Sequence, residues 1–447
     1  MSTDADSSIS ASECAQLLEF KNFLASFAAA ASELTSGNEL TRNGSGNCVT
    51  RSSNDTYKVT ADEQRAEIVS TIWKQLSVKG CPNAFQMKLL HMAADKMEQD
   101  LRHAKECEVN VDLDETQYDL LKLQKFVSSQ LDKFLLKLTD NAAMEKLQLY
   151  ADDEALCRDP AECQCALKPW SPGHSAAAIK NKPRKMEDRH VCLERYGEMY
   201  QLEKHSDCRF FGVFDGHSGA LSACYVTSQI PQLLAHQLQR PVPATGSGEH
   251  NVDFYRNAFE TAFLQADERF AQKRITSGTT AVCALITGEQ QLYIAWVGDS
   301  KALLVGKRTQ LQLVKPHKPE SPDERRRIEV SGGAVIHAQG QWRVNGILNV
   351  GRSIGDYSLE AVIAEPDFVD VQLSEAHDFL ILGTDGLWDH VPESIIVDTI
   401  YECLAEATTQ LDDIPKLLVD AAKDHDSQDN ITVVLVLLKP RDQIGLG

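Results

Sequence analysis

Acidic side chains at the ends of apolar, strand-like runs are the residues best suited to chemistry in this sequence. Val, Ile, Leu and Phe at this density favour strands, and the acids that border the runs are Asp215, Asp299, Asp385 and Asp429. If the strands belong to one sandwich, their ends can bring these carboxylates into a single cleft. The carboxylates would repel one another unless cations neutralised them. The pattern therefore predicts a site for Mg²⁺ or Mn²⁺, hard cations that prefer oxygen ligands.

The segment after the first of these strands adds a proton donor. Asp215 is followed by Gly216, where the backbone can bend sharply, and by His217, which can transfer protons near neutral pH. Upstream, the acidic pair Glu187-Asp188 leads into another apolar run. Two metal ions beside an imidazole would be suited to hydrolysing a phosphate ester with a bound water. The alternative is a surface turn after a buried strand, since Asp-Gly is common in turns.

Size and charge limit the function classes. The chain has 447 residues, 43% hydrophobic and 25% charged, which is typical of a globular protein of two or three domains. Its net charge of −20 argues against nucleic acid or an anionic membrane as the main partner. No apolar run reaches the length of a membrane span, the acidic start lacks a secretory signal, and the 12 cysteines show no zinc spacing. We therefore expect a cytoplasmic location, with the nucleus as a second one.

The distribution of apolar residues, prolines and glycines divides the chain into parts. We expect a largely flexible N-terminus at 1–58 with one short helix near Leu17–Phe27, a helical regulatory or docking region at 59–150 whose clearest helix is 116–149, a linker at 151–174, a catalytic domain at 175–440 and a tail at 441–447. A helical bundle that only packs is the alternative for 59–150.

Strands and helices alternate in the expected catalytic domain. Helices are predicted at 218–239, 252–274, 321–331, 393–407 and 412–424, and the last strand at 431–438. Strands rich in Val and Ile with paired helices between them predict an α+β fold, a β-sandwich flanked by helices on both faces.

The motifs of this domain occur in one order. They are Met186-Glu187-Asp188, Asp215-Gly216-His217-Ser218-Gly219, Ser277-Gly278-Thr279-Thr280, Gly298-Asp299-Ser300, Gly351-Arg352-Ser353-Ile354-Gly355-Asp356, Asp385-Gly386-Leu387-Trp388-Asp389 and Asp429-Asn430. This set closely resembles the metal-dependent Ser/Thr protein phosphatases of the 2C type. The resemblance implies a four-layer αββα fold and hydrolysis of phosphoserine and phosphothreonine in proteins by direct attack of metal-activated water, without a phosphoenzyme.

The resemblance also implies ligands for the metal ions. Asp215 would bridge two Mg²⁺ or Mn²⁺ ions, and a third, weaker ion would bind beside them. The further ligands of the first two ions would be Glu187, the carbonyl of Gly216, Asp385 and Asp429, and those of the third ion would be Asp299, Asp385 and Asp389.

Three more residues receive roles from the resemblance. Asp188 would orient a metal-bound water, and His217 would protonate the leaving alkoxide. The family's usual phosphate-binding arginine, four residues before Glu187, is replaced here by Pro183. Arg184 is our candidate for that contact, because the planar guanidinium fork suits phosphate. The alternative is that Arg184 is a solvated surface charge.

The helical extension and the residues at 184–190 look most like the calcium/calmodulin-dependent protein kinase phosphatase branch. That resemblance implies phosphorylated protein kinases as substrates and a docking or scaffold partner for the helical region. Two other functions compete: a catalytically weak or inactive binding module acting as a signalling scaffold, and a two-metal nuclease. The complete carboxylate set argues against the first, with Pro183 in its favour, and the net charge argues against the second.

Overall fold

The chain forms two units, Met1–Ser171 and Pro172–Gly447, which are described separately. The computed structural model describes residues 11–35, 56–109, 116–139, 173–241, 252–307 and 309–444. Most of the linker predicted at 151–174 lies outside these residues. Within them, no helix is both long and apolar enough to cross a membrane.

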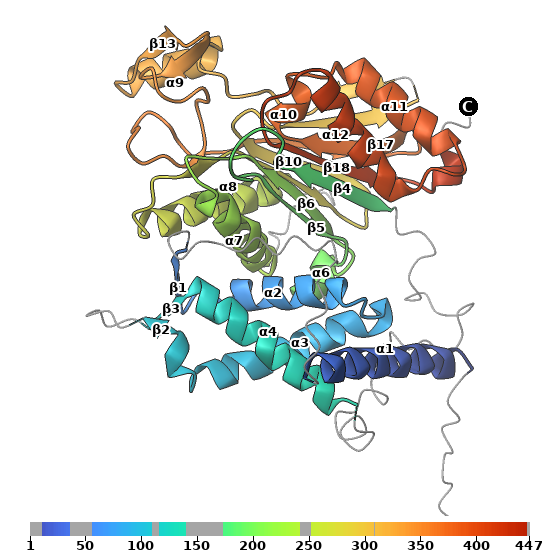
Figure 1. Ribbon diagram of the computed structural model, residues 1–447. Helices are drawn as coiled ribbons and strands as arrows, with labels where there is room; N and C mark the ends of the chain where they lie inside the picture. The colour runs from blue at the N-terminus through green and yellow to red at the C-terminus, as the bar shows by residue number, and fades with distance from the viewer. Residues whose placement is uncertain are drawn as a thin grey trace, which may run out of the picture. The chain divides into compact units, whose positions relative to one another are not determined.

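The described part of the first unit consists of helices and a small antiparallel sheet (Figure 1). Its elements are α1 (Ala11–Thr35), α2 (Gln64–Val78), α3 (Asn83–Leu101), α4 (Leu120–Lys137), β1 (Lys58–Thr60), β2 (Glu108–Val109), β3 (Gln117–Asp119) and a 3₁₀ turn at Lys105–Cys107. Leu123, Val127 and Leu131 of α4 are fully buried, as expected for a stripe at helical spacing. Phe20 of α1 stacks on Phe85 of α3 with ring centroids 4.2 Å apart.

Two predicted helices differ in their limits. The helix expected at 116–149 begins only at Leu120, because residues 117–119 pair with β1 and β2 as strand β3. Asp119 then caps α4 by accepting a hydrogen bond from the backbone N–H of Lys122 at 2.9 Å. The short helix expected near Leu17–Phe27 is part of α1, which has 25 residues.

Two five-stranded antiparallel sheets form the centre of the second unit. The first has the order β16 (Asp367–Gln372), β10 (Gln291–Val297), β9 (Ala281–Ile286), β6 (Arg209–Phe214), β5 (Arg189–Leu193). The second has the order β12 (Thr309–Gln312), β11 (Lys301–Gly306), β17 (His377–Gly383), β18 (Ile431–Leu437), β4 (His174–Ile179).

Helices cover both outer faces of this sandwich (Figure 1). The first sheet carries α7 (Leu221–Leu238) and α8 (Val252–Ala271), and the second carries α11 (Glu393–Ala405) and α12 (Ile414–Asp424). Shorter turns lie at α6 (Tyr196–Met199), Glu203–His205, Leu411–Asp413 and Arg441–Gln443. The predicted sandwich flanked by helices on both faces is therefore confirmed.

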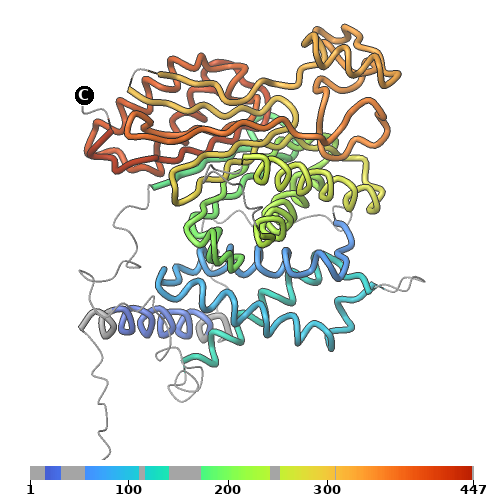
Figure 2. The backbone as a smooth tube through the Cα atoms, turned by 180° about the vertical axis from the view of Figure 1, so that it is seen from behind, coloured from blue at the N-terminus to red at the C-terminus, as the bar shows by residue number. Residues whose placement is uncertain are grey.

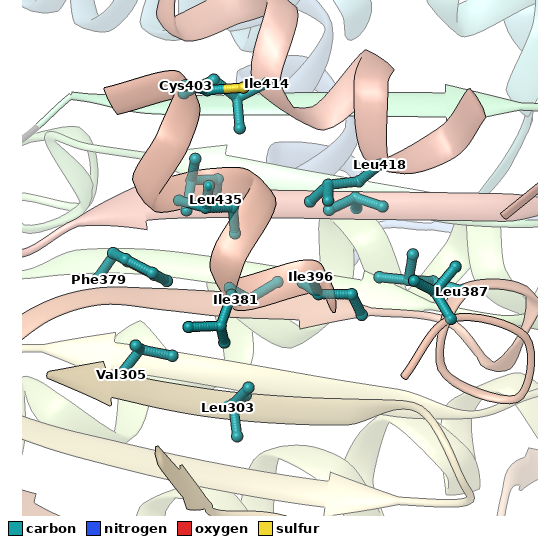
Figure 3. Close-up of a cluster of buried hydrophobic side chains, with 14 of the residues drawn as sticks. Leu303, Val305, Phe379, Ile381, Leu387, Ile396, Cys403, Ile414, Leu418 and Leu435 are labelled. Carbon is teal, nitrogen blue, oxygen red and sulfur yellow. The ribbon is translucent and has the colours of Figure 1, made fainter. Parts of the chain in front are cut away.

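Strand β17 shows why these strands read as continuous apolar runs. Leu380 and Leu382 point into the core between the sheets, whereas Phe379 and Ile381 point outward beneath α11 and α12 (Figure 3). Successive side chains of a strand face opposite sides. A strand covered on both sides therefore needs an apolar residue at every position.

A separate segment lies to one side of the sandwich, drawn in orange in Figure 2. It contains α9 (Pro322–Val330), β13 (Val335–Ala338) and β14 (Gln341–Val344), with a small core of its own around Ile328. The buried carboxylate of Glu324 anchors the segment. It accepts hydrogen bonds from Arg327 Nη2 at 2.9 Å and from Arg352 Nη2 at 2.6 Å.

Candidate active site

Strand pairing brings the acids of the first sheet to one edge. Arg189, the first residue of β5, pairs with Phe214, the last residue of β6. Asp188 therefore precedes β5 at the edge where Asp215 follows β6. Asp299 follows β10, whose end pairs with the start of β9 next to β6.

The second sheet contributes acids from the end of β17 and the start of β18, which pair with each other. Asp385 begins the short helix α10 (Asp385–Trp388) directly after β17, and Asp429 lies just before β18. A glycine permits the two segments to meet, because a Cβ at Gly386 would lie 2.0 Å from the carbonyl oxygen of Asn430. Any side chain at 386 would push these segments apart.

Asp188 connects the two sheets at this edge. Its Oδ2 accepts hydrogen bonds from the hydroxyls of Thr384, at 3.0 Å, and Thr432, at 2.7 Å, both on the second sheet's side. Burial, with a smaller contribution from the charge of Asp429, raises the pKa of Asp188 to about 7 overall, although the hydroxyls of Thr432 and Thr384 act to lower it. Asp188 is therefore fixed in orientation behind the other carboxylates.

Burial and neighbouring carboxylates together raise the pKa of two aspartates at this site, Asp215 and Asp385. Burial and the charges of four neighbouring aspartates raise the pKa of Asp215 well above its usual value. Burial and three neighbouring aspartates do the same to the pKa of Asp385. The aspartates that act on one or both, in addition to this pair, are Asp188, Asp299, Asp389 and Asp429.

This set of oxygen donors is right in kind for a hard divalent cation. Among the described residues, however, no three His, Cys, Asp or Glu side chains are arranged as a complete metal-binding group. The individual ligand assignments therefore stay predictions.

Glu187 and Gly216 meet where the two turns of the site touch. Glu187 Oε2 accepts a hydrogen bond from the backbone N–H of Gly219 at 3.1 Å. A Cβ at Gly216 would lie 2.5 Å from the carbonyl oxygen of Glu187, so only glycine fits there. The buried amide of Asn430 accepts from the Glu187 N–H at 2.6 Å. Asn430 thus lies beside the acids and holds the backbone of Glu187.

His217 is held by Asp356, an aspartate to which the sequence motifs assign no role. Its Nε2 lies 2.6 Å from Oδ2 of Asp356, which also accepts a hydrogen bond from Ser353 Oγ at 2.6 Å. The contact arises because β7 (Gly216–His217) and β15 (Ile354–Gly355) both pair with β8 (Gly278–Thr279). The run 351–356 was visible as a motif, but its partner could not be read from it.

Asp299 is paired with Lys318, a lysine that lies outside the sequence motifs. The ammonium of Lys318 forms an ion pair with Oδ2 of Asp299, whose side chain is only 3% exposed. Although burial lowers the pKa of Lys318, Asp299 and the charges of Asp389 and Asp385 raise it overall. The ammonium of Lys318 is therefore a cation that the chain itself holds at the site.

The remaining predicted residues lie at the surface of the site region. Asp389 and Asp429 are exposed, and Arg184 is exposed in the bend between β4 and β5. The phosphate contact of Arg184 stays a prediction.

Comparison with known proteins agrees with this fold and this order of motifs. A family model described as Protein phosphatase 2C matches residues 173–431. The chain belongs to the protein phosphatase 2C family. Human Protein phosphatase 1E is 33% identical over 390 residues, which are 86% of this chain and 47% of the relative. Human Protein phosphatase 1F is 38% identical over 275 residues, which are 60% of this chain and 58% of the relative.

This protein phosphatase 2C spans about half the length of the curated relatives it matches. A solved structure described as a C. elegans sex determining protein is similar over 98% of both chains, with a TM-score of 0.68 and 20% identity. Serine-threonine phosphatase 2C from Toxoplasma gondii matches 59% of this chain and 94% of its own, with a TM-score of 0.50 and 23% identity. These likenesses show the fold.

Proposed function

We propose that this chain is a Mg²⁺- or Mn²⁺-dependent protein serine/threonine phosphatase. The observation that carries the proposal is the convergence of Asp385, Asp299 and Asp429 on Asp215: burial of Asp215, together with the charges of these neighbours, raises its pKa. A partly buried cluster of like charges is stabilised in its ionised form by cations beside it. Membership of the protein phosphatase 2C family over residues 173–431 gives independent support.

Two ions would share Asp215, and a third would bind more weakly. The remaining ligands would be Glu187, the Gly216 carbonyl, Asp385 and Asp429 for the first two, and Asp299, Asp385 and Asp389 for the third. When bound, such ions lower the pKa of a water and neutralise the phosphoryl oxygens. Attack by this water needs no protein nucleophile, so we expect no phosphoenzyme.

The chain's own residues would orient the reactants and move protons. Asp188, fixed by Thr384 and Thr432, would hold the attacking water in line. His217 turns Nε2 toward Asp356, so Nδ1 is the nitrogen that would protonate the leaving serine or threonine oxygen. An alkoxide is a poor leaving group, and general acid catalysis of this kind contributes about 10²- to 10⁴-fold. Arg184 would contact the substrate phosphate.

The natural substrates are proposed to be phosphorylated proteins, with protein kinases as the first candidates, in the cytoplasm and the nucleus. The first unit would dock substrates or a scaffold, a proposal supported by its being a compact unit separate from residues 172–447. We expect residues 172–447 alone to hydrolyse a phosphopeptide as fast as the full chain but a phosphoprotein more slowly. Equal rates on the phosphoprotein would contradict the docking role.

Metal titration of phosphothreonine-peptide hydrolysis tests the proposed function. We expect no phosphate release in chelator, saturable activation by Mn²⁺, and a loss of about 10³-fold or more in Asp215→Asn, since two ions would lose a shared ligand. Asp420→Asn is the matched control, because Asp420 is exposed and pairs only with nearby Lys423. A folded, Mn²⁺-loaded protein that releases no phosphate from any phosphopeptide would favour the inactive scaffold instead.

A further inference from the structure

Lys318 differs from an ordinary surface lysine in what surrounds its ammonium. The group forms an ion pair with Asp299, and the charges of Asp389 and Asp385 also act on it. These three aspartates are the ones to which the proposed function assigns the third, weaker metal ion. The partner carboxylate of Asp299 is almost completely buried, whereas the lysine side chain is 27% exposed.

The backbone next to Lys318 is fixed to the strand end that carries Asp299. The backbone N–H of His317 donates to the carbonyl of Gly298 at 2.9 Å. In return, the N–H of Gly298 donates to Nδ1 of His317 at 3.1 Å. The His317 ring is 2% exposed and stacks on Trp296. These bonds hold the backbone at 317–318 close to the backbone at 298–299, and the Lys318 ammonium forms an ion pair with the Asp299 carboxylate.

An ammonium and a divalent cation compete for the same carboxylate oxygens. Asp299 Oδ2 cannot coordinate a metal ion while it accepts a hydrogen bond from Lys318, and the positive charge repels any cation approaching the neighbouring aspartates. The tethered ammonium does not have to be taken up from solution. It can therefore neutralise this side of the cluster at any metal concentration.

We propose that Lys318 acts as a built-in cation. Its ammonium occupies part of the site of the third metal ion and so weakens the binding of that ion. The inference rests on the proposed function, because it assigns Lys318 a role toward ions that the phosphatase site would bind. It goes beyond that function by naming the residue that sets how many ions are bound. Lys318 is a positioning residue in this account, since it acts on Asp299 and not on the substrate.

Calorimetric titration of the metal-free full chain with Mn²⁺ tests the inference without reference to activity. In Lys318→Met we expect the third ion to bind at least about tenfold more tightly, because the substitution removes one positive charge that is in contact with a ligand of that ion. Lys318→Arg keeps the charge and should bind the weak ion as the natural protein does. Lys315→Met is the control, because Lys315 lies on the same segment and pairs with exposed Asp323 at 3.0 Å.

Electron paramagnetic resonance of free Mn²⁺ gives an independent count of bound ions. Equal weak-ion affinity in Lys318→Met, Lys318→Arg and the natural protein, with the two tight sites intact, would overturn the inference alone. Absence of the tight sites from the natural protein would overturn both the inference and the proposed function. If Lys318→Met does not fold without metal, weaker Mn²⁺ binding by Lys318→Arg than by Lys318→Gln would still support the inference, and equal binding would refute it.

Discussion

The Nε2 atom of His217 lies 2.6 Å from Oδ2 of Asp356, a residue 139 positions later in the chain. Asp356 is itself buried and bonded to Ser353 Oγ at 2.6 Å, so the imidazole is held by a carboxylate that cannot turn away. This contact fixes the ring orientation and leaves Nδ1 as the nitrogen free to serve the proposed reaction.

Asp356→Asn should therefore slow the hydrolysis of poor leaving groups. We expect kcat for a phosphothreonine peptide to fall about 10- to 100-fold, part of the 10²- to 10⁴-fold that general acid catalysis contributes. An aryl phosphate, whose leaving group needs little protonation, should lose much less. The ratio of the two kcat values measures the effect.

His217→Ala provides the comparison for that measurement. If both residues act as one unit, the double variant His217→Ala/Asp356→Asn should be no slower than His217→Ala alone. Fully additive losses, or equal losses with both substrates, would show that Asp356 only supports the fold.

Gly278→Ala should disturb the contact between His217 and Asp356, because the added methyl group would lie against both side chains. A Cβ at 278 would lie 2.0 Å from Asp356 Oδ2 and 2.4 Å from His217 Nε2. Such overpacking costs about 1–3 kcal/mol of stability, and we expect kcat on the peptide to fall as in Asp356→Asn. Chemical denaturation and kinetics measure the two effects. Unchanged kcat in a folded variant would mean that the His217–Asp356 contact is not used in catalysis.

The raised pKa of Asp188 predicts how the stability of the metal-free protein depends on pH. An ordinary aspartate has a pKa of about 3.9, whereas burial raises that of Asp188 to about 7. Between these values the folded state binds more protons than the unfolded state, so the free energy of unfolding falls as pH rises. The stabilising contribution is complete below about pH 4 and lost above about pH 7.

Urea unfolding in chelator between pH 5 and pH 8 measures this dependence. Asp188→Asn removes the titrating group and should flatten the curve, although Asp215 and Asp385 contribute in the same direction. Added Mn²⁺ should restore stability most at the higher pH. A metal-free protein whose stability rises over this range would contradict the prediction.

The Glu324 anchor should decide the stability of the segment that contains α9. Burial raises the pKa of Glu324, but hydrogen bonds from Arg352 and Arg327 lower it overall, so the anchor weakens only when pH falls through this lowered value. Removing one partner of a buried ion pair costs about 3–5 kcal/mol, so Glu324→Gln should open this segment to proteolysis.

Limited proteolysis and mass spectrometry would locate the cuts, which we expect within 322–348. Glu329→Gln is the control, because its pair with Arg325 is exposed and 3.8 Å long. Exposed pairs contribute about 0–1 kcal/mol. Equal protection of Glu324→Gln and Glu329→Gln would show that the anchor is not needed.

The sequence alone predicted those parts of the molecule that follow from local pattern. Asp215 and Asp385 follow strand-like apolar runs, and the ends of strands in one sandwich can bring such acids into a single cleft. The contact of His217 with Asp356 could not be predicted in this way. It depends on three two-residue strands, β7, β8 and β15, which are too short to give a periodic signal.

The absence of a local sequence signal also explains why the sequence did not predict two other features, the position of Lys318 and strand β3. Lys318 lies in a stretch without helix or strand between β12 and α9, so no periodicity directs its side chain toward Asp299. Residues 117–119 continue the helical pattern of the residues that follow them, and their pairing with β1 and β2 makes them strand β3. In each case a tertiary contact decides the outcome.

The hydrogen bonds that Asp188 accepts from the hydroxyls of Thr384 and Thr432 have a mechanical consequence. They link one sheet of the sandwich to the other at the edge of the proposed active site, so neither sheet can shift without moving a carboxylate to which the proposed function assigns a role. A substitution that loosens the core between the two sheets, such as Leu380→Ala, should therefore slow turnover even at temperatures where the protein is still fully folded. The turnover rate would then report how closely the two sheets of the sandwich pack against each other.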